Sequence, residues 1–257
     1  MASNLSSIGF AFTGADAFQD AMLRLARDAI ERVDCSAGDY SIWRSRTGAE
    51  IWFHLPPFGT EDDARDIAGL TPFFEGTSEV AVEITECITR PGDNEFEGAF
   101  LARLVLDDGA ADQYSLVFDA VDFAVHAERE LPLRAHARLT GFAQSVRAFA
   151  DEAGFAAADA GGHGIRLGPQ AFVPVGQFAN IEDDAAPRTS EVLLTGRVVE
   201  HRKLVNEVTS TPFHWLLVGS VGATFDVVAD PECVRGDIVE DGIVEVRCML
   251  FGRLLEG

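Results

Sequence analysis

Lysine is almost absent from this chain of 257 residues, which contains one lysine and 19 arginines. Lys203 lies between Arg202 and Leu204, so the sequence lacks the phosphate-binding loop in which Gly-Lys precedes a serine or threonine. Any reaction that needs an imine on a lysine would have to use Lys203 itself. The composition therefore excludes one large class of nucleotide-binding enzymes and restricts another to a single residue.

Positive charge as a whole is scarce. The chain has 42 acidic and 20 basic side chains, which gives a formal net charge of −22. The excess is spread evenly, because residues 1–76, 77–150 and 151–257 each hold about twice as many acids as bases. Such a surface repels the phosphate backbone, so a nucleic-acid partner would need a local basic patch that outweighs the general field.

Long apolar runs and paired cysteines are missing as well. No apolar run approaches the ~20 residues that a membrane-spanning helix needs, and residues 1–7 show neither the basic start nor the apolar stretch of a signal peptide. The four cysteines have no C-x-x-C spacing and lie in apolar-rich stretches, which is typical of buried, reduced thiols. We expect a cytoplasmic protein with no membrane partner.

Short catalytic motifs are also absent. The sequence contains no H-E-x-x-H, no G-x-S-x-G and no G-x-G-x-x-G, and its histidines and cysteines lack the spacing of a tetrahedral zinc site. These absences predict no cofactor, no metal and no catalytic residue that can be named. A catalytic constellation assembled from residues far apart in the chain would leave no such trace, so it stays an alternative.

The chain does contain an internal repeat. Residues 77–80 (TSEV) recur as residues 189–192, and over positions 77–106 this offset of 112 gives 8 identities, among them Arg90 with Arg202 and Asn94 with Asn206. Phe118-Asp119 matches Phe225-Asp226 at a slightly different offset, as insertions in loops would produce. The pattern predicts two copies of one unit, near 77–142 and 189–254.

Both copies read as β structure. Short runs rich in β-branched and aromatic residues, broken by Gly, Asp and Pro, predict four strands in each copy, with a possible fifth near Val234–Val239. A unit of this size removes its exposed edges by closing into a small barrel, and Gly196 inside a long first strand suits the bend of an OB-like barrel. We expect an α+β, mainly β protein with two tandem OB-like barrels.

Helix-containing segments are expected before each barrel. Apolar residues spaced by three and four predict a helix over 16–34, followed by a hairpin of residues 40–46 and 49–55 that packs on the first barrel as part of segment 1–76. A second helix is predicted over 144–153, inside a connector at 143–188 that leads to a second barrel at 189–257.

The second copy also resembles a known group of sequences. The segments Thr195–Val198, Asn206 with Thr209, Phe225–Glu232 and Leu250–Arg253 are similar to a segment of uncharacterised bacterial proteins with a C-terminal OB-like barrel. The resemblance covers about residues 189–254. That family has no assigned activity, so the resemblance implies a fold and not a reaction.

One basic stretch stands out as a candidate ligand site. His201, Arg202 and Lys203 are expected at the end of the first strand of the second copy, and His214-Trp215 on the next strand, where an OB-like barrel often holds a ligand. The alternative is an exposed strand end with Trp215 in the core. Arg90, the first-copy counterpart of Arg202, joins the candidates, although each arginine could instead pair with the glutamate of its own Asn-Glu dipeptide, Glu95 or Glu207.

Two further features favour bland interpretations. The stretch Gly161–Gly164 around His163 is typical of a flexible connector more than of a mobile general base. The acidic clusters at 61–63 and 182–184 lack the alternating spacing of a Ca²⁺ loop and indicate solvated loops.

A tandem pair of small barrels without catalytic motifs is most simply a binding protein. We therefore predict a non-enzymatic module that recognises a protein or a small polar ligand, with an undetermined oligomeric state. The first alternative is a single-stranded nucleic-acid binder that uses the basic stretch and Trp215. The second is a hydrolase or metal-dependent enzyme in which carboxylates converge on His163 or His214.

Overall fold

The computed structural model describes residues 3–57, 67–105, 111–158, 166–178 and 188–255. The protein is mainly β with few helices, as the sequence predicted. Its strands form a four-stranded antiparallel sheet near the N-terminus and a ten-stranded sheet that contains both copies of the repeat. No helix in the described ranges is both long enough and apolar enough to cross a membrane.

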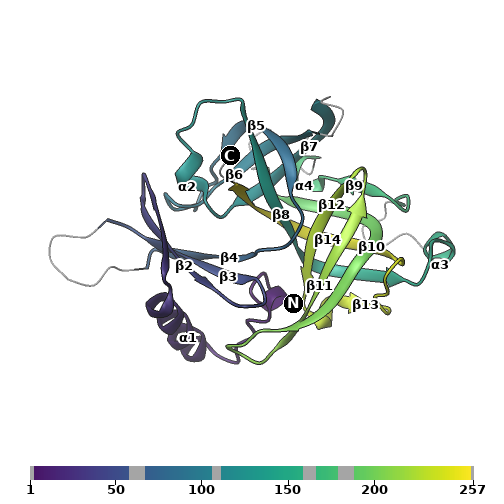
Figure 1. Cartoon of the computed structure of the whole chain (residues 1–257), viewed down its shortest axis with the longest axis horizontal. Coiled ribbons are helices and arrows are strands. Elements are labelled where there is room, and N and C mark those ends of the chain that lie inside the picture. Colours follow the sequence, from purple (N-terminus) through teal and green to yellow (C-terminus); the bar gives the residue numbers. More distant parts are fainter. Residues whose placement is uncertain (1–2, 58–66, 106–110, 159–165, 179–187, 256–257) are drawn as a thin grey trace.

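The N-terminal part consists of one helix and one sheet (Figure 1). After the short helix η1 (Ser6–Ile8), helix α1 (Ala15–Asp28) buries an apolar stripe that includes Met22 and Leu25. The sheet has the order β1 (Glu31–Cys35), β2 (Gly38–Arg44), β3 (Ala49–Leu55) and β4 (Gly69–Phe74). The predicted hairpin around residues 47–48 is confirmed as β2 and β3.

The helix predicted over 16–34 is correct only to Asp28. Ala29 has extended backbone angles that end the helix, and residues 31–35 instead form β1, which pairs with β2 from Glu31 opposite Ile42 to Cys35 opposite Gly38. The apolar spacing that suggested one more helical turn is overridden, because pairing with β2 satisfies the same backbone groups in a ladder.

The ten-stranded sheet closes into two rings that share two strands. The first ring runs β5 (Val80–Ile88), β6 (Ala99–Val105), β7 (Ala111–Ala120), β14 (Ile243–Leu255) and β8 (Leu133–Phe149) back to β5. The second ring runs β10 (Glu191–Val205), β11 (Pro212–Ser220), β12 (Ala223–Ala229), β8 and β14 back to β10. Each ring therefore contains one long strand from the other half of the sequence.

Short elements connect and cover these strands. Helix α2 (Phe123–His126) follows β7, and η2 (Pro231–Cys233) with β13 (Val234–Arg235) follows β12. Between the two halves of the sequence lie α3 (Glu152–Ala157), β9 (Ala171–Val173) and α4 (Val175–Phe178). The two-residue strand β13 lies where a fifth strand was expected, and it pairs with β8. Figure 1 shows β8 and β14 crossing the middle of the molecule.

The helix predicted over 144–153 is wrong for most of its length. Residues 144–149 continue β8, because their backbone pairs with β14 as far as Phe149 opposite Ile243. Helix α3 begins only at Glu152, where the Asp151 side chain accepts a hydrogen bond from the Gly154 amide at 2.7 Å. Strand β8 therefore runs across the expected boundary between 142 and 143.

Strand β10 is long and changes its partner along its length. Its first part, Glu191–Arg197, pairs with β14, and its second part, Arg197–Val205, pairs with β11. Gly196 lies at the change of partner, where a Cβ atom would come within 2.5 Å of the Gly219 carbonyl oxygen. A side chain there would push the two strands apart.

Two serine–aspartate contacts, which we name the Ser–Asp clasps, join the halves reciprocally. Ser78 donates from its amide and its hydroxyl to Oδ2 of Asp226 on β12. Ser190 donates from its hydroxyl to Oδ2 of Asp119 on β7 at 2.6 Å. Each serine belongs to the repeated TSEV sequence of one half and each aspartate to the repeated Phe-Asp of the other half.

The Asp226 clasp is the more deeply buried of the two. Asp226 has no exposed surface, and its Oδ1 accepts from the Thr77 amide at 3.1 Å and from Trp215 Nε1 at 2.7 Å. Asp119 keeps 18 % of its side chain exposed and is held by Arg90 Nη1 at 2.6 Å. A buried carboxylate with several donors is stable only while those donors are in place.

The N-terminal sheet packs against both rings. Tyr40 donates from its hydroxyl to the Phe96 carbonyl at 2.7 Å and accepts from the Ala124 amide, and Asn206 donates to the Ile8 carbonyl at 2.9 Å. Glu75 accepts from the adjacent arginines of β8 and β14, Arg138 and Arg253. These contacts explain why the sheet shares one apolar cluster with both rings.

We expect Asp226→Ala to lower the free energy of unfolding by about 3 to 5 kcal/mol, because it leaves an indole, a hydroxyl and two amides buried without an acceptor. Asp119→Ala, at the partly exposed clasp, is expected to cost about 1 to 2 kcal/mol. Urea denaturation of both variants measures the difference. Equal losses would contradict the unequal burial of the two clasps.

Candidate functional site

Strand alternation divides the predicted basic patch between two faces. On β10 and β11, Lys203 pairs opposite His214, and Arg202 pairs opposite Trp215. Side chains of directly opposed residues point to the same face, and neighbours along a strand point to opposite faces. The six candidate residues of the sequence therefore do not form one site.

Three of the candidates, His201, Lys203 and His214, line one pocket of about 250 Å³, which we name the ring-mouth pocket. Leu216, two residues after His214 and on the same face of β11, is fully buried in the cluster inside the rings. The pocket therefore lies at the end of the second ring. The segment that follows β12 covers it with Pro231, Val234, Gly236, Asp237 and Ile238.

The two histidines of the ring-mouth pocket form a direct contact. His201 Nε2 and His214 Nδ1 are 2.9 Å apart, and the ring planes differ by 18°. Burial, then His201, then Lys203 lower the pKa of His214 to about 4. Burial and Lys203 also lower the pKa of His201, against the opposing effect of Glu240.

The pKa directions define the charge of this pocket near neutral pH. Both imidazoles are neutral, so one nitrogen of the His201–His214 contact donates and the other accepts. Lys203 has no ion pair with another residue in the described ranges. The pocket therefore offers one ammonium group and imidazole nitrogens to a ligand, with the carboxylate of Asp237 also in its lining.

Arg202 and Trp215 serve the packing of the other face. Trp215 is 3 % exposed and donates to Asp226, but it is buried in the apolar cluster shared with the N-terminal sheet and not inside the barrel, where the alternative had placed it. The Arg202 guanidinium carbon lies 5.2 Å from the centroid of the Trp215 ring, and its Nε donates to Glu200 at 2.7 Å. The Trp215 ring is not available to stack a base.

Arg90 lies in a different pocket, of about 270 Å³, between β4 and the first ring. Its Nε donates to the Arg188 carbonyl at 3.0 Å, in addition to the contact with Asp119. The pairing considered for Arg90 and Arg202 with Glu95 and Glu207 is therefore wrong. Arg90 instead pairs with Asp119, which β7 brings close from a distant part of the sequence, and Arg202 pairs with Glu200, two positions earlier on β10.

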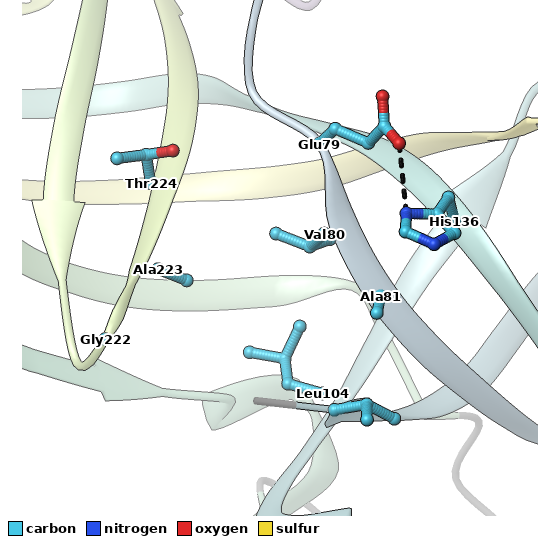
Figure 2. A pocket seen from close by; sticks show the side chains of 9 residues that line it. Glu79, Val80, Ala81, Leu104, His136, Gly222, Ala223 and Thr224 are labelled. Carbon is cyan, nitrogen blue, oxygen red and sulfur yellow. Dashed lines mark ion pairs between the residues drawn. The ribbon is translucent and has the colours of Figure 1, made fainter. Parts of the chain in front are cut away.

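A cavity of about 570 Å³, larger than the two pockets above, lies at the seam between the two rings, and we name it the seam cavity. Figure 2 shows Thr224 and Ala223 of the second ring on one side and Glu79 with His136 on the other, with Val80 and Leu104 between them. His136 Nδ1 lies 3.0 Å from Glu79 Oε1. No sequence pattern pointed to this cavity, because its lining comes from β5, β6, β8, the turn at Gly222 and the start of β12.

The clasps are a different case, because the sequence contained a usable signal. Ser78 matches Ser190 and Asp119 matches Asp226 in the repeat, and identical polar residues between two diverged copies point to shared hydrogen bonds. His163 and both acidic clusters lie outside the described residues. Within the described ranges, no group of three or more His, Cys, Asp or Glu could hold a metal ion.

The cysteines are all unpaired. Cys248 is buried as expected, whereas Cys35, Cys87 and Cys233 are half-buried. Burial raises the pKa of the Cys233 thiol to about 11, so this group is a poor nucleophile near neutral pH.

Comparisons with known proteins add no functional assignment: no family model, no curated protein and no solved structure matches the chain.

We expect Lys203→Met to raise the pKa of His214 while leaving it below the ordinary value of 6.5, because the ammonium is a smaller cause than burial. The matched control is Arg202→Met, which removes a neighbouring charge from the opposite face. Titration of the imidazole signals by NMR measures both values. An equal rise in the two variants would contradict the assignment of faces.

Proposed function

We propose that this protein is a non-enzymatic binding module whose ring-mouth pocket takes a small polar ligand with an anionic group. The observation that carries the proposal is the convergence of Lys203, the single lysine of the chain, with His201 and His214 around one pocket. A pocket of about 250 Å³ suits a molecule smaller than a typical drug, since drug-sized sites occupy ~300–1,000 Å³.

The charge of the pocket supports an anionic ligand. Lys203 supplies a cation without an ion-pair partner in the described ranges, and the neutral His214 adds Nε2, whereas His201 bonds His214 and the Ile238 backbone. Asp237 in the lining disfavours a ligand of high negative charge. A ligand with one carboxylate or phosphate group for Lys203 and a separate hydrogen-bond donor for Asp237 would satisfy both charged groups of the pocket.

We further propose that the two halves are copies of one OB-like unit that have exchanged strands. The support is the matching of pairings: β7 meets β14 with Asp119 opposite Phe251, and β12 meets β8 with Asp226 opposite Thr140, each next to a glycine. The glycines, Gly252 and Gly141, occupy positions where a Cβ would come within 2.8 Å of a neighbour. In both rings, three consecutive antiparallel strands are followed by a strand that pairs in parallel with the third, and then by a strand that pairs antiparallel and closes the ring. This is the strand order of OB-type barrels.

The alternatives have less support. A single-stranded nucleic-acid binder would work against a net charge of −22 and without the Trp215 ring as a stacking surface. An enzyme that uses His214 would need carboxylates converging on it, and Asp237 is the one in the pocket lining. The reduced cysteines favour a cytoplasmic location for the module.

The proposal is tested by thermal shift and calorimetry with phosphate, acetate, succinate and citrate at low ionic strength. We expect saturable binding of at least one of these anions, weakened about tenfold or more by Lys203→Met, because a lost charge-assisted hydrogen bond costs about 1.5 to 3 kcal/mol. Arg202→Met, on the opposite face of β10, should leave affinity unchanged.

Two outcomes would count against the proposal. Equal weakening in the Lys203 and Arg202 variants would indicate a diffuse surface effect and not a pocket. Turnover of a bound compound by the wild-type protein would refute the non-enzymatic part.

A further inference from the structure

The seam cavity differs from the ring-mouth pocket in both place and chemistry. It is lined by residues of both rings, and most of its side chains are apolar: Val80, Ala81, Leu104, Val105 and Ala223. The polar groups are Glu79, His136 and Thr224 (Figure 2). At about 570 Å³ it falls within the range of small-molecule sites.

The seam exists because two strands use the same edge of β8 in succession. β5 pairs with β8 from Val80 opposite Ala137 to Ile84 opposite Leu133, whereas β12 pairs with it from Asp226 opposite Thr140 onward. The Ser78–Asp226 clasp closes the gap between these two pairings. Beyond the clasp, the start of β12 and the start of β5 face the cavity from opposite sides.

The charge at the cavity comes from Glu79. Its Oε1 contacts His136 Nδ1, whereas Oε2 has no hydrogen-bond or ion-pair partner within the described ranges. The contact with His136 engages one oxygen of the carboxylate and leaves the other available to a cation. The net charge of −22 adds a general attraction for positive ligands.

We propose that the seam cavity binds an organic cation with an apolar body, such as an amine on an aliphatic chain. The ammonium group contacts Glu79 Oε2, and the chain lies against Ala81, Val105 and Ala223, whose side chains are partly exposed. Thr224 offers a hydroxyl that accepts a hydrogen bond from the same cation. This site goes beyond the anion-binding function of the ring-mouth pocket and does not depend on it.

The repeat supplies a matched control for Glu79. Glu191 is its counterpart in the TSEV sequence, and it pairs with Arg247, which takes the place of His136 at the corresponding position of β14. The permanently charged guanidinium of Arg247 neutralises Glu191, so Glu191 offers less charge to a ligand. Glu191→Gln removes the same charge from the chain without touching the seam cavity.

The test uses butylamine, pentylamine and hexylamine as probes, with hexanoate as the charge-reversed probe, measured by calorimetry on the whole chain. Affinity is expected to rise about fourfold for each methylene group, because each adds buried apolar surface. Hexanoate should bind at least tenfold more weakly than hexylamine. Lys203→Met should leave hexylamine binding unchanged, which separates this site from the ring-mouth pocket.

Two variants locate the binding. Glu79→Gln should weaken hexylamine binding by about tenfold, and Glu191→Gln should leave it unchanged. Ala223→Phe should abolish it by filling the cavity, whereas Ala17→Phe, on the exposed surface of α1, should have no effect. Thermal unfolding checks that each variant is folded. Where a variant is not folded, binding is located instead by the change in the NMR signals of Thr224 when hexylamine is added to the wild-type protein.

Three results would overturn the proposal. The first is no saturable binding of hexylamine. The second is equal affinity for hexylamine and hexanoate. The third is hexylamine binding that survives both Glu79→Gln and Ala223→Phe, or that leaves the Thr224 signals unmoved.

Discussion

The exchange of β8 and β14 between the two halves is the constraint on which the other features depend. Neither ring closes without a strand from the other half, and the Ser–Asp clasps fix the positions at which those strands enter. An open ring would expose the unpaired edge of a strand and leave the buried Asp226 carboxylate without its donors. Ring closure and burial of Asp226 therefore occur together, and the two halves form one cooperative unit.

This constraint also decides where sites can form. Closed rings leave room at their ends and at the seam where they part, and the segments that follow β7 and β12 cover corresponding ends. In the first ring, Phe123 of α2 fills the end by packing against Phe100 and closely over Gly98. In the second ring, the segment around η2 and β13 lines the ring-mouth pocket without filling it. The two halves thus differ at the segment that covers the end of each ring, because a loop can change without disturbing ring closure.

The sequence predicted strands well and their partners poorly. Alternating apolar residues identified β5 to β8 and β10 to β14, because a strand with one buried face shows that pattern whichever strand it pairs with. For the same reason the pattern could not reveal the exchange, since Gly141 and Gly252 would suit pairing within a half as well as between halves. Periodicity failed at residues 31–34 and 144–149, where ladder pairing outweighed helical spacing. The basic residues proposed as one patch include neighbours along a strand. Residues separated by an odd number of positions necessarily point to opposite faces of that strand.

The scarcity of lysine can be understood from the contacts that the arginines make. Arginine presents several donors in a fixed plane, so one guanidinium can hold a carboxylate and a second group at once. Arg90 holds Asp119 and the Arg188 carbonyl in this way, and Arg253 holds Glu75 at the sheet–ring contact. Lysine is a compact charge that is less suited to such fixed pairs. Lys203 forms no ion pair within the described ranges, and it lines the ring-mouth pocket together with the neutral imidazoles of His201 and His214. In a chain that uses its cations to hold itself together, a cation left free beside a cavity is the one best placed to meet a ligand.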